Sequence, residues 1–230
     1  MKQTDIINPF QPYMTLEMDG YSQINRTDYG ISHFYEFTIH DEKKHCIKAV
    51  PDASIDLLFN IGENKVSTYI SGTVFGVKKW ELGTQDDCFG VRFQPGQGIL
   101  PKDITMEMIV NDDIEIDGDI FGKNLTEKIA LAKTMSERID IFKKAYEDMV
   151  LGRTSLSDKE KINEYLVNRI SRTKGMITMR QLEDETNYSA CYLRRIFKSF
   201  HGISPKQFAQ YIRFQNLLMQ ADKEGVRYEQ

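Results

Sequence analysis

Residues 176–220 carry the signals for two short helices with a tight turn between them. Thr178 and Gln181 have the spacing of a capping box, which predicts that a helix begins there. Asn187 tolerates the left-handed conformation that closes a helix, and Ser189 is a preferred N-cap for a second helix. The sequence therefore predicts two helices separated by about four residues, which is typical of a helix-turn-helix.

The second of these helices, at 190–200, has two chemically different faces. Apolar residues at spacings of three and four predict one buried stripe, formed by Leu193, Ile196, Phe197 and Phe200. Cys191, Arg194, Arg195 and Lys198 fall outside this stripe. Arginine matches the O6 and N7 acceptors of guanine and lysine neutralises phosphate, so this face suits a nucleic-acid groove. A solvated basic face on a helical hairpin is the alternative interpretation.

The order of residues in this stretch also carries a family resemblance. The string LxxxxNYSxxYLRRIFKxxxGISPxQFxQYIR, which starts at residue 182, resembles the first helix-turn-helix of AraC/XylS-type transcription regulators. The resemblance implies that the second helix enters the major groove of promoter DNA. By motif position, it implies that Cys191, Arg194 and Arg195 face the bases. Tyr192 and Lys198 are then better placed for phosphates.

The chain departs from the family pattern in its length and at two positions. Asn187 replaces a usual glycine and Phe208 a usual tyrosine, and both changes are physically mild. Regulators of this type hold two units joined by a long helix, and Ser204 and Pro205 predict the start of that helix. The 230 residues end before a second unit. We therefore expect either a piece of a longer chain or a naturally half-equipped regulator, and the latter could act by heterodimerisation without binding DNA.

The net charge of the chain is distributed unevenly. Residues 152–230 contain 14 Lys and Arg against 9 Asp and Glu, a net charge of +5, whereas the rest of the chain has a net charge of −9. A basic part beside an acidic part is typical of a DNA-binding module joined to a different module.

Composition favours a cytoplasmic protein. No apolar run approaches the ~20 residues of a membrane span, and the first residues lack the basic and apolar regions of a signal peptide. The cysteines Cys46, Cys88 and Cys191 are far apart and form no CxxC pair. This spacing argues against disulfides and against a cysteine metal site.

The N-terminal half shows the period and the turn residues of short strands. Residues 1–30 are expected to be irregular because Pro and Gly interrupt them. Residues 105–116 fit either a strand or a short helix. The expected strands lie at 32–39, 54–61, 66–71, 73–82 and 88–93, and this series predicts a β-sandwich or barrel.

Two strand motifs carry a second resemblance. The strings PDASIDLLFNIG at 51–62 and GVRFQPG at 90–96 resemble the cupin-like domain of one AraC-type subgroup, with Ala53 where glycine is common. The resemblance implies a small β-barrel that senses a ligand or a protein partner. It also implies that the helices after the barrel form a homodimer.

From residue 124 the apolar period changes from two to 3.6. Helices are expected at 124–133 and 136–150, a linker at 151–154, and a further helix that opens with a capping box at Ser157 and packs against the helix-turn-helix. The first two helices have more apolar surface than a small barrel needs, so we expect a two-fold interface. The candidate interface residues are Ile139, Phe142, Tyr146 and Met149.

Polar residues within apolar strand motifs are the candidates for an effector site. Arg92 points away from the apolar residues beside it if the strand alternates strictly. A structural ion pair with Asp56 is one interpretation, and an anchor for an anionic effector is the other. Tyr35 and Trp80 are candidates to line the same cavity, although most strand aromatics are expected in the core.

Enzymatic and metal-binding classes are weaker hypotheses. His33, His40 and His45, with Glu36, invite comparison with cupin metal sites, but their spacing differs from the compact HxH set of enzymatic cupins. No nucleophile elbow, P-loop or paired-carboxylate signature is present. We therefore expect neither metal, cofactor nor catalysis, and a cupin-type metalloenzyme is the alternative.

The expected fold is α+β with three parts. They are a cupin-like sensor at 1–118, a helical dimerisation segment at 119–152 and an AraC-type DNA-binding region at 153–230. The expected function is regulation of transcription through promoter DNA.

Overall fold

The computed structural model has a mixed α+β fold. It describes residues 8–17, 20–38, 46–63, 65–81, 87–98, 100–152 and 155–224. The predicted linker at 151–154 lies partly outside these ranges. Of the helices in the described ranges, none has the length and apolar character needed to cross a bilayer.

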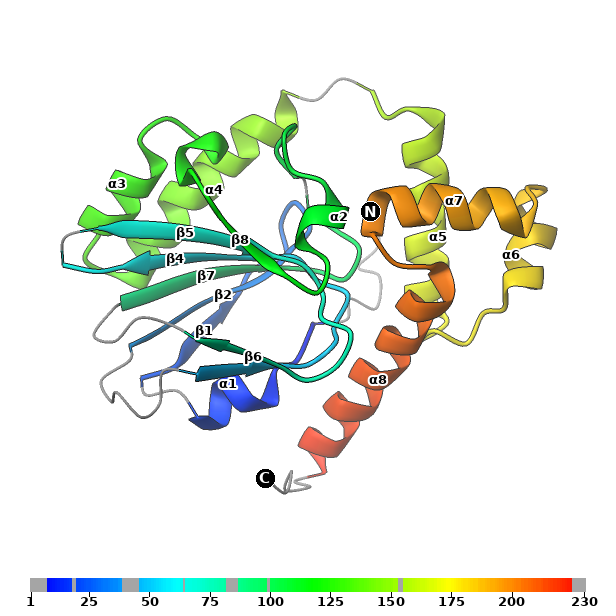
Figure 1. Cartoon of the computed structure of the whole chain (residues 1–230), viewed down its shortest axis with the longest axis horizontal. Helices are drawn as coiled ribbons and strands as arrows, with labels where there is room; N and C mark the ends of the chain where they lie inside the picture. The colour runs from blue at the N-terminus through cyan, green and yellow to red at the C-terminus, as the bar shows by residue number, and fades with distance from the viewer. Residues whose placement is uncertain are drawn as a thin grey trace.

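Two antiparallel sheets form the N-terminal half (Figure 1). The larger sheet has six strands in the order β1 (Ser22–Asn25), β2 (Ile31–Thr38), β7 (Asp87–Phe93), β4 (Asp56–Ile61), β5 (Val66–Ser71) and β8 (Asp113–Ile116). The smaller sheet pairs β3 (Cys46–Ala49) with β6 (Lys78–Glu81). Strands distant in sequence, such as β2 and β7, thus lie side by side, as non-local antiparallel pairing allows.

The helices fall into two groups along the chain. Beside the sheets lie α1 (Pro12–Glu17), α2 (Met106–Ile109), the 3₁₀ helix η1 (Gly118–Phe121), α3 (Leu125–Leu131) and α4 (Met135–Leu151). The C-terminal part is helical and contains α5 (Asp158–Arg172), α6 (Met179–Thr186), α7 (Ala190–His201) and α8 (Pro205–Lys223). Figure 1 shows this part beside the end of the large sheet.

Several strand expectations need correction. Residues 1–30 are not wholly irregular, because they include α1 and β1. The expected strand at 73–82 is confined to β6, and β3 was not expected. The ambiguous stretch at 105–116 contains both structures, α2 followed by β8. Short edge elements like these have too few residues to show a clear period.

The helix α4 covers one face of the large sheet. Phe142 packs edge-on against Phe34 and Phe59, with ring centroids 6.0 and 6.3 Å away, and Arg138 pairs with Glu36 of β2. The dimer interface predicted from sequence is therefore wrong for three of its four residues. The chain's own sheet covers Ile139, Phe142 and Tyr146, and the half-buried Met149 packs on the same core.

The C-terminal helices enclose a second core. Leu166 of α5, Leu193 and Phe197 of α7, and Phe208 and Ile212 of α8 are buried together. The capping boxes predicted from sequence are confirmed at Thr178 and Ser157, and the helix start predicted at Ser204 is confirmed, with a capping box to Gln207. As expected, α5 packs against α7.

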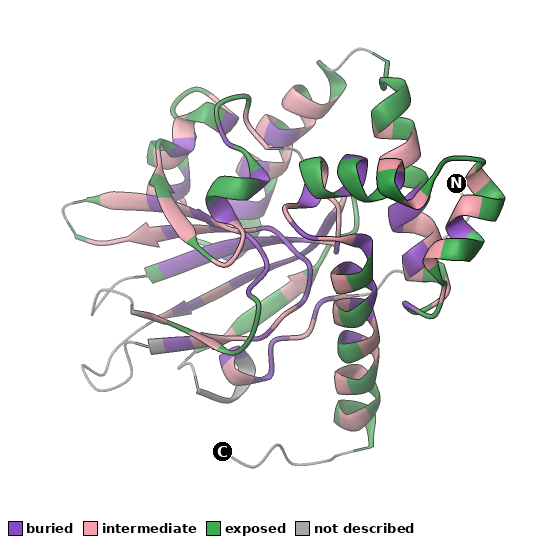
Figure 2. Ribbon diagram, turned by 45° about the vertical axis from the view of Figure 1, so that its right-hand side comes forward, coloured by how far each residue is buried: buried purple, intermediate pink, exposed green. Residues whose placement is uncertain are grey.

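The second core extends onto the sheet half of the chain. Ala53, at the loop before β4, is part of it and has a left-handed φ of 60°. The Cβ of an added side chain at Gly96 would lie 2.9 Å from Val167 and 3.1 Å from Phe208. The loops at 51–53 and 94–98 thus contact α5 and α8, and Figure 2 shows where the two halves of the chain meet, with buried and partly buried residues in these loops.

Candidate functional site

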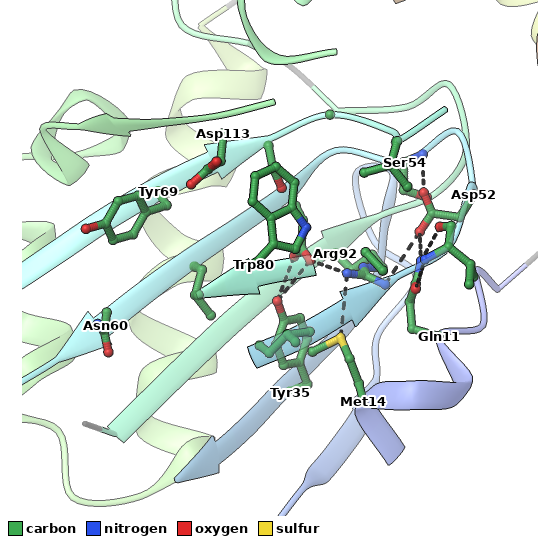
Figure 3. A pocket seen from close by; sticks show the side chains of 18 residues that line it. Gln11, Met14, Tyr35, Asp52, Ser54, Asn60, Tyr69, Trp80, Arg92 and Asp113 are labelled. Atoms are coloured by element: carbon green, nitrogen blue, oxygen red, sulfur yellow. Dashed lines mark hydrogen bonds and ion pairs between the residues drawn. The ribbon is translucent and has the colours of Figure 1, made fainter. Parts of the chain in front are cut away.

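A polar cavity lies between the two sheets, on the face of the large sheet opposite α4 (Figure 3). Its volume is about 150 Å³. Strict alternation places Phe34, Leu57 and Val91 in the core with α4 and turns Tyr35 and Arg92 into the cavity. The candidate effector residues Tyr35, Asp56, Trp80 and Arg92 all line this cavity, so the structure brings the four together.

Gly90 gives Tyr35 its position in the cavity wall. The two residues are opposite one another in the β2–β7 pair. A Cβ at position 90 would overlap the Tyr35 ring, so only glycine leaves space for it. The Tyr35 hydroxyl then donates to the carboxylate of Asp56, with distances of 2.9 Å to each oxygen.

Arg92 is at the centre of a buried ionic network. It is 5% exposed and donates to Asp56 through Nη2, and its Nη1 lies 3.5 Å from Oδ2 of Asp52. Burial alone would lower the pKa of Arg92, but the two carboxylates raise it. Burial also raises the pKa of Asp56, against the opposing effect of Arg92. Arg92 is therefore both a structural ion pair and part of the cavity wall.

The N-terminal segment closes the end of the cavity that contains Arg92. The side-chain amide of Gln11 donates to Oδ2 of Asp52 at 2.8 Å and to the carbonyl of Val50 at 2.9 Å. Among the described residues that line the cavity, three buried side-chain atoms have no hydrogen-bond partner: Oγ of Ser54, and Nε and Nη1 of Arg92, of which Nη1 lies within ion-pair distance of Asp52. Buried polar atoms without hydrogen-bond partners are rare in folded proteins. Where such atoms face a cavity, a bound molecule could supply the missing hydrogen bond.

Aromatic and acidic side chains line the other end. Figure 3 shows Tyr69 and Asp113 together there, with Trp80 between them and Arg92. Burial raises the pKa of Asp113. Sequence reasoning missed Gln11, Asp52 and Asp113. Only Asp52 had a signal, since it stands in the 51–62 motif.

The histidines show no metal centre in the described part of the chain. His33 is buried, and burial followed by the nearby Arg92 lowers its pKa to about 3. His40 and His45 lie outside the described residues. Among the residues that are described, no three His, Cys, Asp or Glu side chains group as metal ligands would.

The second candidate site is the outer face of α7. Cys191, Arg194, Arg195 and Lys198 are exposed, and they fall within an arc of about 100° at 100° per residue. Cys191, Arg195 and Lys198 point most directly away from the buried stripe, and Arg194 lies at its flank. Figure 2 shows this face of α7 as a continuous exposed strip.

Hydrogen bonds at its first turn fix α7 relative to α6. Asn187 ends α6 in the left-handed conformation with φ of 58°, as predicted. The next helix starts three residues later, where Ser189 accepts from the amide of Tyr192 at 3.3 Å. Glu183 of α6 also accepts from the amide of Ala190. The first turn of α7 is therefore capped twice and fixed to α6.

Aromatic stacking positions one of the basic side chains. Tyr192 is half-buried and its ring contacts that of Tyr188 in a tilted arrangement, with ring centroids 5.1 Å apart. The guanidinium carbon of Arg195 lies 5.4 Å from the Tyr192 ring centroid. This cation–π contact already restricts the side chain of Arg195. Arg195 would therefore lose less conformational entropy when it binds a partner.

Comparison with known proteins places the cavity strands in one family model. Residues 29–115 match a family described as a domain of unknown function (DUF6597). The match runs from the start of β2 into β8 and so includes most of the cavity wall. No curated protein and no solved structure matches the chain.

Proposed function

We propose that this protein is a sequence-specific DNA-binding transcription regulator of the AraC type, controlled by a ligand at its N-terminal domain. In this proposal α6 and α7 act as a helix-turn-helix, and the two sheets act as a cupin-like sensor. The observation that carries the proposal is the exposed basic face of α7, fixed by two caps to α6 and backed by a core of its own.

The geometry supports a role for each residue on that face. Arg195 is central and stacked on Tyr192, so we assign it the main base contact. Arg194, about 100° away around the helix, is assigned a flanking base or sugar contact. Lys198 lies one turn further along and suits a phosphate. Cys191, exposed at the first turn, suits an apolar contact with a thymine methyl group.

The test is binding of promoter DNA from the protein's own genomic neighbourhood, followed by fluorescence anisotropy. Arg195→Ala should weaken binding by roughly 1–3 kcal/mol and relax preference at one base pair. Lys198→Ala should weaken all sequences about equally and reduce the salt dependence by about one counterion.

A matched control removes a positive charge elsewhere. Lys159 is exposed and belongs to α5, outside the basic face of α7, so Lys159→Ala should change affinity by less than about threefold. If Arg194→Ala and Arg195→Ala both bind like the unmodified chain at several salt concentrations, α7 is not the recognition helix. Heterodimerisation without DNA contact would then be the better hypothesis.

A further inference from the structure

The charges around the cavity do not suit an anionic ligand. Arg92 is the basic residue in its lining, and two carboxylates already compensate it, Asp56 by a hydrogen-bonded ion pair and Asp52 at 3.5 Å. A carboxylate or phosphate group would have to displace one of them. Anion binding at Arg92 would therefore place like charges together in a buried space.

The opposite end of the cavity has a further carboxylate, Asp113, whose pKa is raised by burial and lowered by the nearby charge of Lys78. Asp113 lines the cavity and forms no ion pair with any described residue. The nearby Lys78 is outside the lining, and its Nζ binds Asp112 at 3.2 Å and the carbonyl of Asn111 at 2.6 Å. The lining as a whole thus has three carboxylates and one guanidinium.

Aromatic rings complete a site for positive charge. Trp80, Tyr69 and Tyr35 line the cavity, and the electron-rich faces of such rings attract ammonium groups. Trp80 already receives one ammonium within the chain, since Nζ of Lys78 lies 3.8 Å from its ring centroid. Burial raises the pKa of both Asp56 and Asp113, and a cation in the cavity would stabilise their charged forms.

A neutral polar group would find partners in the same cavity. Ser54 is 4% exposed, lines the cavity, and its Oγ has no hydrogen-bond partner. Its hydroxyl can donate or accept. The volume of about 150 Å³ is close to that of a cavity that holds benzene, so the occupant is small.

We propose that the cavity binds a small organic ammonium that also carries a hydroxyl or carbonyl group. The ammonium lies near Asp113 and the aromatic rings, and the neutral polar group lies near Ser54. This rests on the sensing role proposed above and gives that role a chemical class of effector.

The experiment uses probes of graded size and matched charge on the whole chain. Ethanolamine, benzylamine and tyramine are compared with glycolate, benzoate and 4-hydroxyphenylacetate, and benzyl alcohol is the neutral reference. Calorimetric titration gives the affinity. At least one amine should bind about tenfold or more tightly than its anionic counterpart.

Asp113→Asn is the decisive variant because Asp113 supports no ion pair of the fold. It should weaken the best amine by about tenfold and leave benzyl alcohol unchanged. Glu115→Gln is the matched control, since Glu115 is on the same strand but outside the cavity lining. The inference is overturned if no amine binds at millimolar concentration, if an anion binds better than its amine, or if Asp113→Asn has no effect.

Promoter binding measured in the same preparations separates this inference from the proposed function. Loss of amine binding with promoter binding retained would overturn only the cation site. Amine binding without any promoter binding would overturn only the DNA-binding role.

Discussion

The ring of Tyr35 occupies the space where a side chain at position 90 would lie. Gly90→Ala should therefore destabilise the protein by about 3 kcal/mol, because the buried ring or the β7 backbone must shift to make room for the added Cβ. Urea unfolding measures this change. Gly76→Ala is the control, since nothing lies within 4 Å of an added Cβ there. Equal stability of the two variants would show that Tyr35 can repack.

His201 makes the fold sensitive to acid. It is buried beside the second core, where its Nε2 lies 2.8 Å from Oδ1 of Asn163 and its ring makes a tilted contact with Phe197. Burial lowers the pKa of His201 from 6.5 to about 3. Between these values the unfolded chain binds one more proton than the folded chain, so stability is lost as the pH falls below 6.5.

The variant His201→Gln should remove this contribution. One such histidine contributes about 2 kcal/mol of lost stability between pH 7 and pH 5. The free energy of unfolding of the variant should thus fall less steeply with acidification than that of the unmodified chain. His33, whose pKa is also lowered to about 3, contributes a second slope that both proteins share. Parallel pH profiles would show that His201 is not the group responsible.

At the scale of elements, the sequence predicted the features that depend on residues close together in the chain, such as helix caps and the direction of side chains in a strand. The caps at Thr178, Ser189 and Ser204 are confirmed because each depends on a side chain and an amide three residues apart. Strand alternation likewise predicted that Arg92 points away from the apolar residues beside it, since side-chain direction has a period of two, whereas the pairing of β4 with β7 places Asp56 opposite it.

The surface that packs against the apolar face of a helix was not predictable in the same way. The apolar stripe of α4 is in the sequence, but it is equally compatible with a partner chain and with the chain's own sheet. The structure shows the second, with Phe142 fully buried among the rings of β2 and β4. For the same reason Gln11 and Asp113 were missed as cavity residues, because strand pairing and the path of the N-terminal segment bring them there. A homodimer and the recognition role of α7 stay predictions.

At the scale of the whole molecule, one buried glutamine of α8 connects the helical part to the cavity wall. Gln215 is fully buried, its Oε1 accepts from the amide of Phe10 at 2.7 Å, and its Nε2 donates to the carbonyl of Pro51 at 2.9 Å. The next residues along the chain are Gln11 and Asp52, which bind each other and line the cavity. We therefore expect a change in the cavity wall to reach α8 in part through this side chain.

Gln215→Leu replaces this side chain with an apolar one of similar size and removes both hydrogen bonds. A buried amide and a buried carbonyl lose their partner, so we expect a loss of stability of about 2 kcal/mol or more. Hydrogen exchange should also become faster at residues 9–11 and 50–53, not only in α8, because the side chain joins the three segments. Gln220→Leu, at an exposed position of the same helix, should change neither. Faster exchange confined to α8 would mean that Gln215 stabilises its own helix and does not couple the cavity wall to the helical part.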